Sequence, residues 1–245
     1  MKSLVKYPLS VWSWLTFGLL IAIWLPLVAI TFAATRPFDK ARYWPGYVFR
    51  RLPVVHKFLN PHWKFRIDGV FPANPRHPYV VVCNHQSFVD MLLISQLPWE
   101  MKWMSKQSLF KVPVAGWIMR MAGDIEIERG DARSALKALR ECQNKLDMKV
   151  SVMMFPEGTR SRSGELGEFK DGAFKLAIDA GVPILPIVLN GTYNALTPHS
   201  WTFNNVRADL KVLPPIETSS YTRREASLLR QHVQGVMAEE LAKMS

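Results

Sequence analysis

A histidine and an aspartate five residues apart, His85 and Asp90, have the side chains needed for acid–base chemistry. On one continuous helix they would point about 140° apart, so they can meet only if a helix starts between them. Ser87 supplies that start, and the Asp90 carboxylate can then reach back toward the loop. The pair predicts a histidine general base held by a carboxylate. Two ordinary explanations stay open: Ser87 and Asp90 also form a capping box, and a histidine after a strand is often only a hydrogen-bonded loop residue.

A turn that carries an arginine follows at residues 155–161 (Phe-Pro-Glu-Gly-Thr-Arg-Ser). Gly158 lets the backbone approach an anion closely, and the planar guanidinium of Arg160 matches a pair of phosphate oxygens. Glu157 is interpreted as a residue that orients this loop rather than as a proton carrier. The alternative is an ordinary turn whose arginine pairs with a nearby carboxylate. Two such motifs at strand ends favour a ligand site, since open α/β sheets bind ligands there.

The elements that must position these motifs alternate between strand and helix. Continuous apolar runs predict buried strands at residues 79–83, 150–155 and 183–189, the third near a sheet edge because it contains two prolines. The predicted helices start or stop at recognisable capping residues: residues 87–97 before Pro98, a helix capped by Asp131, residues 172–180 before Gly181, and a terminal helix behind the Thr222–Glu225 capping box. This alternation predicts one α/β domain.

The N-terminal segment is of a different kind. Residues 7–35 carry no charged side chain, and as one helix these 29 residues would be about 43 Å long, enough for a bilayer core of about 30 Å. A cleaved signal peptide has a shorter apolar core, and a soluble core helix rarely stays charge-free for so long, so membrane insertion is the favoured interpretation. Pro26 predicts a kink or a break. We therefore expect a membrane-binding segment over residues 1–60 and a catalytic domain over residues 61–245.

Two modes of insertion stay open. In a single span, the basic residues that follow the segment outnumber those before it, which places the domain in the cytoplasm; they are Arg36, Lys40, Arg42, Arg50 and Arg51, against Lys2 and Lys6. Alternatively, residues 7–35 and 43–59 form a hairpin that enters one leaflet. Both modes keep the domain beside the cytoplasmic face.

Composition excludes several classes of protein. Of the 245 residues, 49% are hydrophobic, which excludes wholesale disorder, and two cysteines exclude a disulfide-dense scaffold. No zinc-type Cys/His cluster and no glycine-rich nucleotide loop occur, and no metal is expected at Cys83, His85 and Asp90, because Cys83 alternates away from the site on its strand. The net charge of +11 suits an anionic membrane or a phosphorylated substrate; nucleic acid is not expected beside a membrane anchor.

Taken together, three motifs resemble the 1-acyl-glycerol-3-phosphate acyltransferase family over about residues 70–215. They are Asn84-His85 followed by Asp90, residues 155–161, and residues 182–186 (Val-Pro-Ile-Leu-Pro). Residues 123–129 resemble a weaker family motif, in which Arg129 matches the family's arginine and Glu126 stands where many members have an aromatic or apolar residue. The resemblance implies a glycerolipid acyltransferase-like fold, with a mixed central sheet flanked by helices.

The resemblance also implies a reaction. His85 would act as general base on the sn-2 hydroxyl of lysophosphatidic acid, oriented by Asp90, and the hydroxyl would attack an acyl thioester of coenzyme A or acyl carrier protein to give phosphatidic acid. The implied substrate-binding residues are Arg160, Gly158, Glu157, Thr159, Arg129 and Lys106. No cofactor and no metal are implied. The expected location is the cell membrane, such as a bacterial inner membrane, among its phospholipids.

Other functions stay open at this point. The acceptor could be another lysophospholipid or lipid hydroxyl, or the protein could be a thioesterase or a non-catalytic phospholipid-binding protein. An aromatic–basic stretch also suits a lipid interface, although ordinary packing explains any one member equally well; it contains Trp99, Trp103 and Trp117 with Lys102, Lys106, Lys111 and Arg120.

Overall fold

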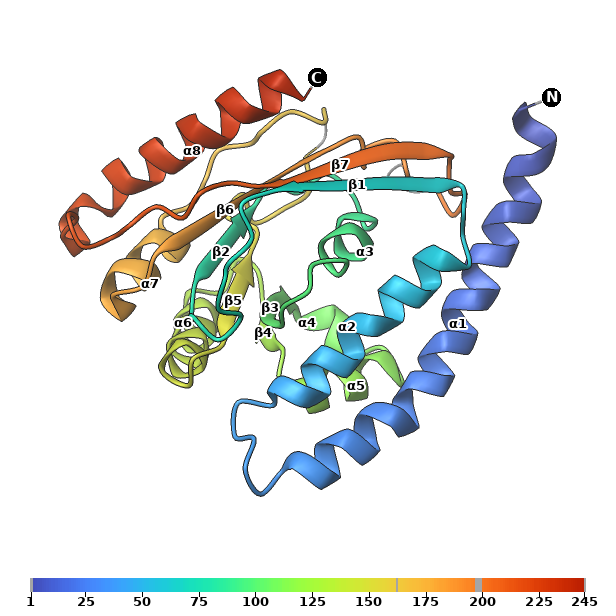
Figure 1. The fold of residues 1–245 in the computed structure, drawn as a ribbon, viewed down its shortest axis with the longest axis horizontal. Helices are drawn as coiled ribbons and strands as arrows, with labels where there is room; N and C mark the ends of the chain where they lie inside the picture. The colour runs from blue at the N-terminus through green and yellow to red at the C-terminus, as the bar shows by residue number, and fades with distance from the viewer. Residues whose placement is uncertain (1, 162, 197–199, 245) are drawn as a thin grey trace.

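The fold is a mixed, seven-stranded sheet flanked by helices, as expected (Figure 1). The computed structural model describes residues 2–161, 163–196 and 200–244. Its elements are α1 (Lys2–Thr35), α2 (Tyr43–Phe58), β1 (Trp63–Gly69), β2 (Val80–Cys83), α3 (Asp90–Ile94), β3 (Met101–Lys106), α4 (Gln107–Phe110), α5 (Ala115–Ala122), β4 (Ile125–Ile127), α6 (Ala132–Asp147), β5 (Ser151–Met154), α7 (Gly172–Ala180), β6 (Ile184–Asn190), β7 (Val206–Val212), the 3-10 helix η1 (Arg223–Glu225) and α8 (Ala226–Lys243).

The strand order is β1-β7-β6-β2-β5-β3-β4. Strands β6, β2, β5, β3 and β4 are mutually parallel, whereas β7 is antiparallel to β6 and β1 is parallel to β7. Five strands therefore end at the same edge of the sheet. The loops that follow them are brought together there, and this edge holds the candidate site.

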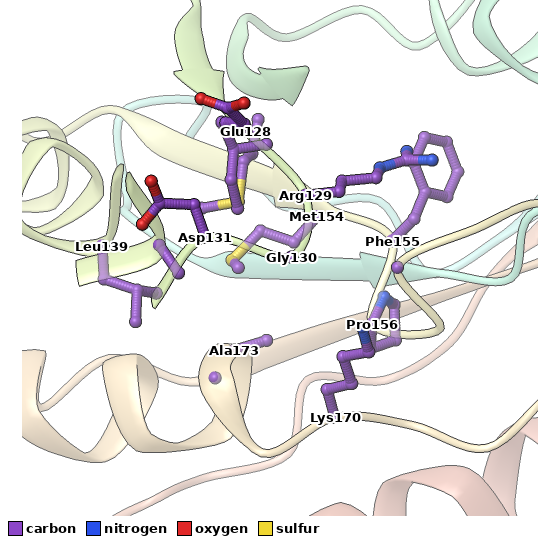
Figure 2. Close-up of a pocket in the computed structure, with 15 residues that line it drawn as sticks. Glu128, Arg129, Gly130, Asp131, Leu139, Met154, Phe155, Pro156, Lys170 and Ala173 are labelled. Carbon is purple, nitrogen blue, oxygen red and sulfur yellow. The ribbon is translucent and has the colours of Figure 1, made fainter. Parts of the chain in front are cut away.

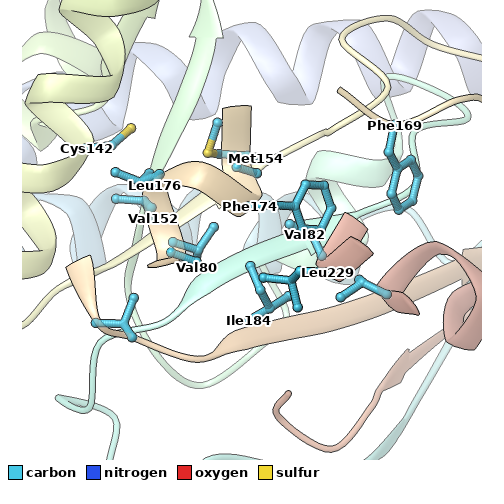
Figure 3. Packing of buried hydrophobic residues seen from close by; sticks show 14 of the residues in the cluster. Val80, Val82, Cys142, Val152, Met154, Phe169, Phe174, Leu176, Ile184 and Leu229 are labelled. Carbon is cyan, nitrogen blue, oxygen red and sulfur yellow. The ribbon is translucent and has the colours of Figure 1, made fainter. Parts of the chain in front are cut away.

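Side chains of the central strands alternate between two apolar cores. Val80 and Val82 of β2 face a core made with α6, α7 and α8, while Val81 and Cys83 face the opposite core; all four are completely buried. Figure 3 shows the first core, in which Phe174 of α7 packs over the strands. Burial on both faces explains why these strands read as unbroken apolar runs.

The predicted strands at residues 79–83, 150–155 and 183–189 all form, but the expected edge position of the third is wrong. Strand β6 lies between β7 and β2, inside the sheet. It tolerates Pro186 because that residue falls in an interruption of the pairing on the β7 side, between the Ile187–Val212 pair and an isolated bridge from Ile184. The missing N–H of Pro186 therefore costs no ladder hydrogen bond.

Three of the four predicted helices form with the expected caps. The Asp131 carboxylate accepts from the N–H groups of Arg133 and Ser134, Gly181 ends α7 with φ of 61°, and the Thr222–Glu225 capping box precedes α8. The helix predicted over residues 87–97 is wrong in extent, because only Asp90–Ile94 is helical. Its expected first turn is instead held by hydrogen bonds to the Asp90 carboxylate.

The N-terminal segment forms a helical pair. Helix α1 continues through Pro26, so of the two expected outcomes, a kink or a break, the break does not occur, and the helix lies antiparallel to α2 (Figure 1). The Trp24 Nε1 donates to the Val48 carbonyl at 2.7 Å, and the Ser13 hydroxyl donates to Asn60 Oδ1 at 2.6 Å. By length and composition, residues 6–35 are the one candidate membrane span within the described part of the chain, with a mean hydropathy of 2.3.

Buried ionic groups tie α2 to the rest of the protein. Arg50 of α2 is paired with Asp124, which precedes β4. Beside them, Lys102 is completely buried and its ammonium donates to Glu100 at 2.7 Å and to the Ala122 carbonyl. The interpretation of Lys102 as a lipid-interface residue is therefore wrong, and so is that of Trp99 and Trp103, which are also buried. The domain boundary at residue 60 stays a prediction.

Candidate active site

The histidine and the aspartate singled out in the sequence meet at the end of β2. His85 Nδ1 lies 2.7 Å from Asp90 Oδ2, and the Asp90 side chain is completely buried while 10% of the His85 side chain is exposed. Because Nδ1 is used by the carboxylate, Nε2 is the ring nitrogen available to a substrate. This is the arrangement required of an oriented general base.

Asp90 is held by four donors from two segments of the chain. Besides His85, its Oδ2 accepts from the backbone N–H groups of Gln86 and Ser87 at 2.7 and 2.8 Å, and its Oδ1 accepts from the hydroxyl of Thr192. Multiple hydrogen bonds stabilise a buried carboxylate in its charged form. Asp90 therefore has a fixed orientation toward His85 Nδ1.

The capping-box alternative is only half present. The Asp90 carboxylate does reach back to the Ser87 N–H, but the Ser87 hydroxyl accepts from Val89 at 3.3 Å and the helix itself starts at Asp90. A complete box would also place the hydroxyl on the N–H of the third helical residue. The structure thus gives Asp90 a local structural role as well as the contact with His85.

Thr192 was missed by the sequence analysis. It follows β6, is completely buried, and its hydroxyl lies within hydrogen-bond distance of both Asp90 Oδ1 and Gln86 Oε1. Strand β6 ends at the same edge of the sheet as β2 and β5, and its place beside β2 is what brings Thr192 to Asp90.

Glu157 positions the backbone of His85. Its Oε1 accepts from the His85 N–H at 2.8 Å and its Oε2 accepts from the Gly167 N–H at 3.1 Å, while the Ser161 N–H donates to the His85 carbonyl at 2.7 Å. Burial raises the pKa of Glu157, although these two N–H donors act against the rise. The turn after β5 is thereby clamped onto the loop after β2, which joins the two motifs into one site.

An aromatic ring connects this pair to a basic pocket. Phe155 stacks on the His85 imidazole, with ring centroids 3.9 Å apart and an interplanar angle of 14°. Figure 2 shows the Arg129 guanidinium beside the same phenyl ring. Phe155 lines a pocket of about 210 Å³ with Arg129, Gly158 and Lys170, and the acidic residues Glu128 and Asp131 also line it.

The positive groups at this pocket follow two strands, β4 and β5. Burial, and secondly the charge of Arg160, lower the pKa of Arg129, so the two guanidiniums lie close enough to repel each other. Gly158 has φ of 72°, and a Cβ there would come within 2.9 Å of the Lys170 ammonium. Lys170, which the sequence analysis did not single out, therefore covers the glycine turn. A bound anion would relieve the repulsion among these cations.

The remaining predicted substrate-binding residues lie at the rim. Thr159 and Arg160 are exposed on the turn after β5, and Lys106 is exposed at the end of β3. Among the described residues, the walls of the pocket include neither these three nor Glu157. Within the same described residues, no group of three His, Cys, Asp or Glu side chains could hold a metal ion.

A second cavity, apolar and about 370 Å³ in volume, lies beside the residues that flank Asp90. Phe88 and Met91, which flank Asp90, form part of its wall together with Trp14, Phe17 and Ile21 of α1. The α4–α5 region and Trp103 complete it. Its lining is almost entirely apolar, which suits a hydrocarbon chain.

Fold and site together define a class: an α/β protein with a histidine–aspartate pair at the parallel strand ends, whose neighbours line one pocket that contains two cations and a second, apolar one. The family model described as "Acyltransferase" matches residues 64–190, more than half of the chain, and the chain belongs to that family.

Named relatives agree with this assignment. The chain is 38% identical over 191 residues to a chloroplastic 1-acyl-sn-glycerol-3-phosphate acyltransferase of Brassica napus, covering 76% of this chain and 54% of the relative. It is 33% identical over 197 residues to the human 1-acyl-sn-glycerol-3-phosphate acyltransferase alpha, covering 80% and 70%. The chain thus spans about half the length of the Brassica protein, and less of two other photosynthetic relatives, from Arabidopsis thaliana and Chlamydomonas reinhardtii.

A solved structure extends the similarity to the whole chain. The crystal structure of the 1-acyl-sn-glycerophosphate acyltransferase PlsC of Thermotoga maritima superposes with a TM-score of 0.84 at 26% identity. The match covers 100% of this chain and 98% of that one, so it includes the N-terminal helical pair.

Proposed function

We propose that this protein transfers a fatty acyl group from an acyl thioester to the sn-2 hydroxyl of 1-acyl-glycerol-3-phosphate, giving phosphatidic acid for phospholipid synthesis. The observation that carries the proposal is that neighbours of the His85–Asp90 pair line both pockets. Phe155, which stacks on His85, lines the pocket that contains Arg129 and Lys170, and Phe88 and Met91 line the apolar cavity. A lysophosphatidic acid has a phosphate for the first pocket and an acyl chain for the second. The names of the relatives support the same substrate.

In the proposed reaction, His85 Nε2 removes the proton of the acceptor hydroxyl as its oxygen attacks the thioester carbonyl carbon. The tetrahedral intermediate then collapses, the C–S bond breaks, and the leaving thiolate takes the proton back from His85. Asp90 keeps the imidazole oriented and stabilises its protonated form. Proton transfer of this kind contributes about 10²- to 10⁴-fold, and orientation of the two substrates supplies much of the rest.

The acceptor phosphate is proposed to bind at the positive groups around Gly158. Arg129 and Lys170 line this pocket and Arg160 stands at its rim, so a phosphate there would neutralise charges that now repel one another. Thr159 and Lys106 are placed to contact the head group only from the rim.

Attachment to the membrane is proposed to occur through α1. Its large exposed side chains are apolar, including Leu15, Leu19 and Ile30, each more than 60% exposed. Both halves of α1 are fixed to the protein, by Trp14 Nε1 to the Trp201 carbonyl and by Trp24 Nε1 to the Val48 carbonyl. These contacts favour a hairpin in one leaflet over a detached span.

The location proposed is the cell membrane, such as a bacterial inner membrane, with the catalytic domain on the cytoplasmic face. The basic residues that follow α1 support this side, although Arg50 no longer counts among them because it is buried against Asp124. The acyl donor is proposed to be acyl-CoA or acyl-acyl carrier protein, with no cofactor.

The test measures free thiol release from acyl-CoA by the full chain in detergent, with and without lysophosphatidic acid. Release that depends on the acceptor and is abolished by His85→Ala supports acyl transfer. Equal release without acceptor would identify a thioesterase. No release from acyl-CoA, and none from acyl-acyl carrier protein, would contradict catalysis. A panel of lysophospholipids at fixed donor then distinguishes lysophosphatidic acid from the alternative acceptors.

A further inference from the structure

The connection between α4 and α5 presents apolar side chains to the outside. Leu109, Val112 and Trp117 are 36%, 46% and 54% exposed, and the basic residues Lys111 and Arg120 are exposed beside them. We call residues 107–120 the α4–α5 corner. Exposed large apolar groups next to cations are typical of a surface that meets a membrane interface.

The backbone of the α4–α5 corner has a defined, strained conformation that buried side chains hold in place. Val114 adopts φ of 64° and ψ of −60°, a conformation that β-branched residues rarely adopt, and a Cβ on Gly116 would lie 2.1 Å from the Phe110 carbonyl oxygen. Phe110 and Ile118 are buried and anchor it. Backbone strain of this kind persists only where the surroundings enforce it.

The α4–α5 corner continues the exposed face of α1. Helix α5 packs against both α1 and α2, and Figure 1 shows α4 and α5 beside this helical pair. The outward residues of α1, such as Leu19 and Ile23, are 61% and 45% exposed. One apolar surface therefore runs from α1 to the corner.

The apolar cavity opens within this surface. Three of its lining residues are themselves at least 36% exposed: Trp14 on α1, and Leu109 and Val112 on the α4–α5 corner. A residue that both lines a cavity and reaches the surface marks its mouth. The mouth thus lies between α1 and the corner.

We propose that the α4–α5 corner inserts into the same phospholipid leaflet as the exposed face of α1, so that the apolar cavity opens sideways into the acyl region of that leaflet. The occupant of this surface is an anionic phospholipid layer, since Lys111 and Arg120 are exposed cations beside the apolar side chains of the corner and the chain carries a net charge of +11. An acyl chain then reaches the cavity without crossing water. Only the entry of a substrate acyl chain into the cavity rests on the proposed function; the insertion of the corner does not.

The first experiment measures lipid contact by site-directed labelling of the full chain. Both native cysteines are completely buried, and burial raises the pKa of Cys142 to about 12, so an introduced cysteine is the reactive one. Variants Trp117→Cys and Leu19→Cys are labelled with a small fluorophore and bound to phosphatidylglycerol vesicles that contain chain-nitroxide lipids. Leu136→Cys on α6, where the native leucine is 59% exposed, is the matched control.

Strong quenching of the labels at positions 117 and 19, with little at 136, supports the proposal. Quenching at position 117 no greater than at 136 overturns it, whatever happens at position 19. Val112→Cys provides a second apolar site in the corner, should Trp117→Cys fold poorly. Because quenching does not depend on turnover, an inactive protein that still quenches at 117 would contradict the proposed function and leave this inference standing.

The second experiment tests the charges of the corner. In the double variant Lys111→Gln, Arg120→Gln, we expect binding to anionic vesicles to fall about fivefold for each charge removed, and binding to neutral vesicles to stay unchanged. The matched control is Lys137→Gln, Arg140→Gln on α6, whose side chains are also exposed. An equal loss in both double variants would indicate a net-charge effect and would contradict a specific role for the corner.

Discussion

At the scale of single residues, Asp90 combines two tasks in one carboxylate. Its Oδ2 holds both the His85 imidazole and the N–H groups of the turn that carries it, so the base and its loop are oriented by the same atom. Removing the charge should therefore affect the reaction far more than removing a helix cap would. The comparison with Ser87 separates these effects.

For Asp90→Asn we expect a fall in kcat of roughly 10²- to 10⁴-fold, because an amide cannot stabilise the protonated imidazole. For Ser87→Ala we expect a loss of at most about 1 kcal/mol in the free energy of unfolding and a small change in kcat. Acyl transfer kinetics and denaturant unfolding measure the two quantities. Similar, modest effects in both variants would show that Asp90 is only a cap.

Thr192 is expected to act as a positioning residue through Asp90. Thr192→Val keeps the shape of the side chain but leaves Asp90 Oδ1 without this donor, so we expect kcat to fall roughly 10- to 100-fold with little change in KM. Thr192→Ser restores the hydroxyl and should restore most of kcat. If the serine variant is as impaired as the valine variant, the hydroxyl is not what matters.

The two guanidiniums at the basic pocket should act on one substrate only. For Arg129→Ala and Arg160→Ala we expect the KM for lysophosphatidic acid to rise about 10-fold or more, because a charge-assisted hydrogen bond is worth about 1.5–3 kcal/mol. The KM for the acyl donor should change little. A comparable rise in both KM values would place the donor, rather than the acceptor phosphate, at this pocket.

At the scale of elements, buried ion pairs join β3 to α2 and β4. Lys102, Glu100, Arg50 and Asp124 lie between these elements, and their side chains are at most 8% exposed. Burial lowers the pKa of Lys102, while contact with Glu100 acts against this shift. Such a cluster stabilises the fold only while each charge keeps its partner.

Lys102→Met should lower the free energy of unfolding by about 3–5 kcal/mol, because it leaves Glu100 buried without its ammonium partner. Lys211→Met is the control, since Lys211 forms an ion pair of similar length with Glu240 while its side chain is 39% exposed. There we expect at most about 1 kcal/mol. Equal losses in a denaturant titration would contradict the importance of burial.

At the scale of the whole molecule, a lysine between three segments makes stability depend on pH. Lys145 of α6 donates to the Ala41 carbonyl beyond α1, and burial, helped by the charges of Lys102 and Arg42, lowers its pKa to about 8. The folded protein therefore loses this proton at lower pH than the unfolded chain. Stability from this group is present at high pH and is lost as the pH falls through about 8.

We accordingly expect the free energy of unfolding to rise between about pH 8 and pH 9.5 more steeply in the native protein than in Lys145→Met. Comparing the two cancels the opposite contribution of buried thiols and phenols, whose pKa values are raised by burial, so that they lower stability as the pH passes the ordinary values of 9.0 and 10.0. Chemical unfolding at a series of pH values gives both curves. Parallel curves would show that Lys145 titrates normally.

The sequence by itself determined what depends on near neighbours along the chain. Unbroken apolar runs identified β2, β5 and β6, since strands buried on both faces need no polar positions. Caps such as Asp131 and Gly181 follow from backbone groups within one turn of a helix. The contact between His85 and Asp90 also belongs here, because the two residues are only five positions apart and the turn between them is held by the N–H groups of Gln86 and Ser87 on the Asp90 carboxylate.

Tertiary structure alone decided what depends on pairing between distant segments. The place of β6 inside the sheet brings Thr192 to Asp90 across 102 positions of sequence, and no local pattern encodes a strand's neighbours. Likewise, Trp103 and Trp117 lie in one aromatic–basic stretch, yet the first is buried and the second exposed. Burial of a side chain is set by what packs over it, and for Trp103 that cover includes Arg50 of α2, whose guanidinium lies 4.8 Å from the ring centroid.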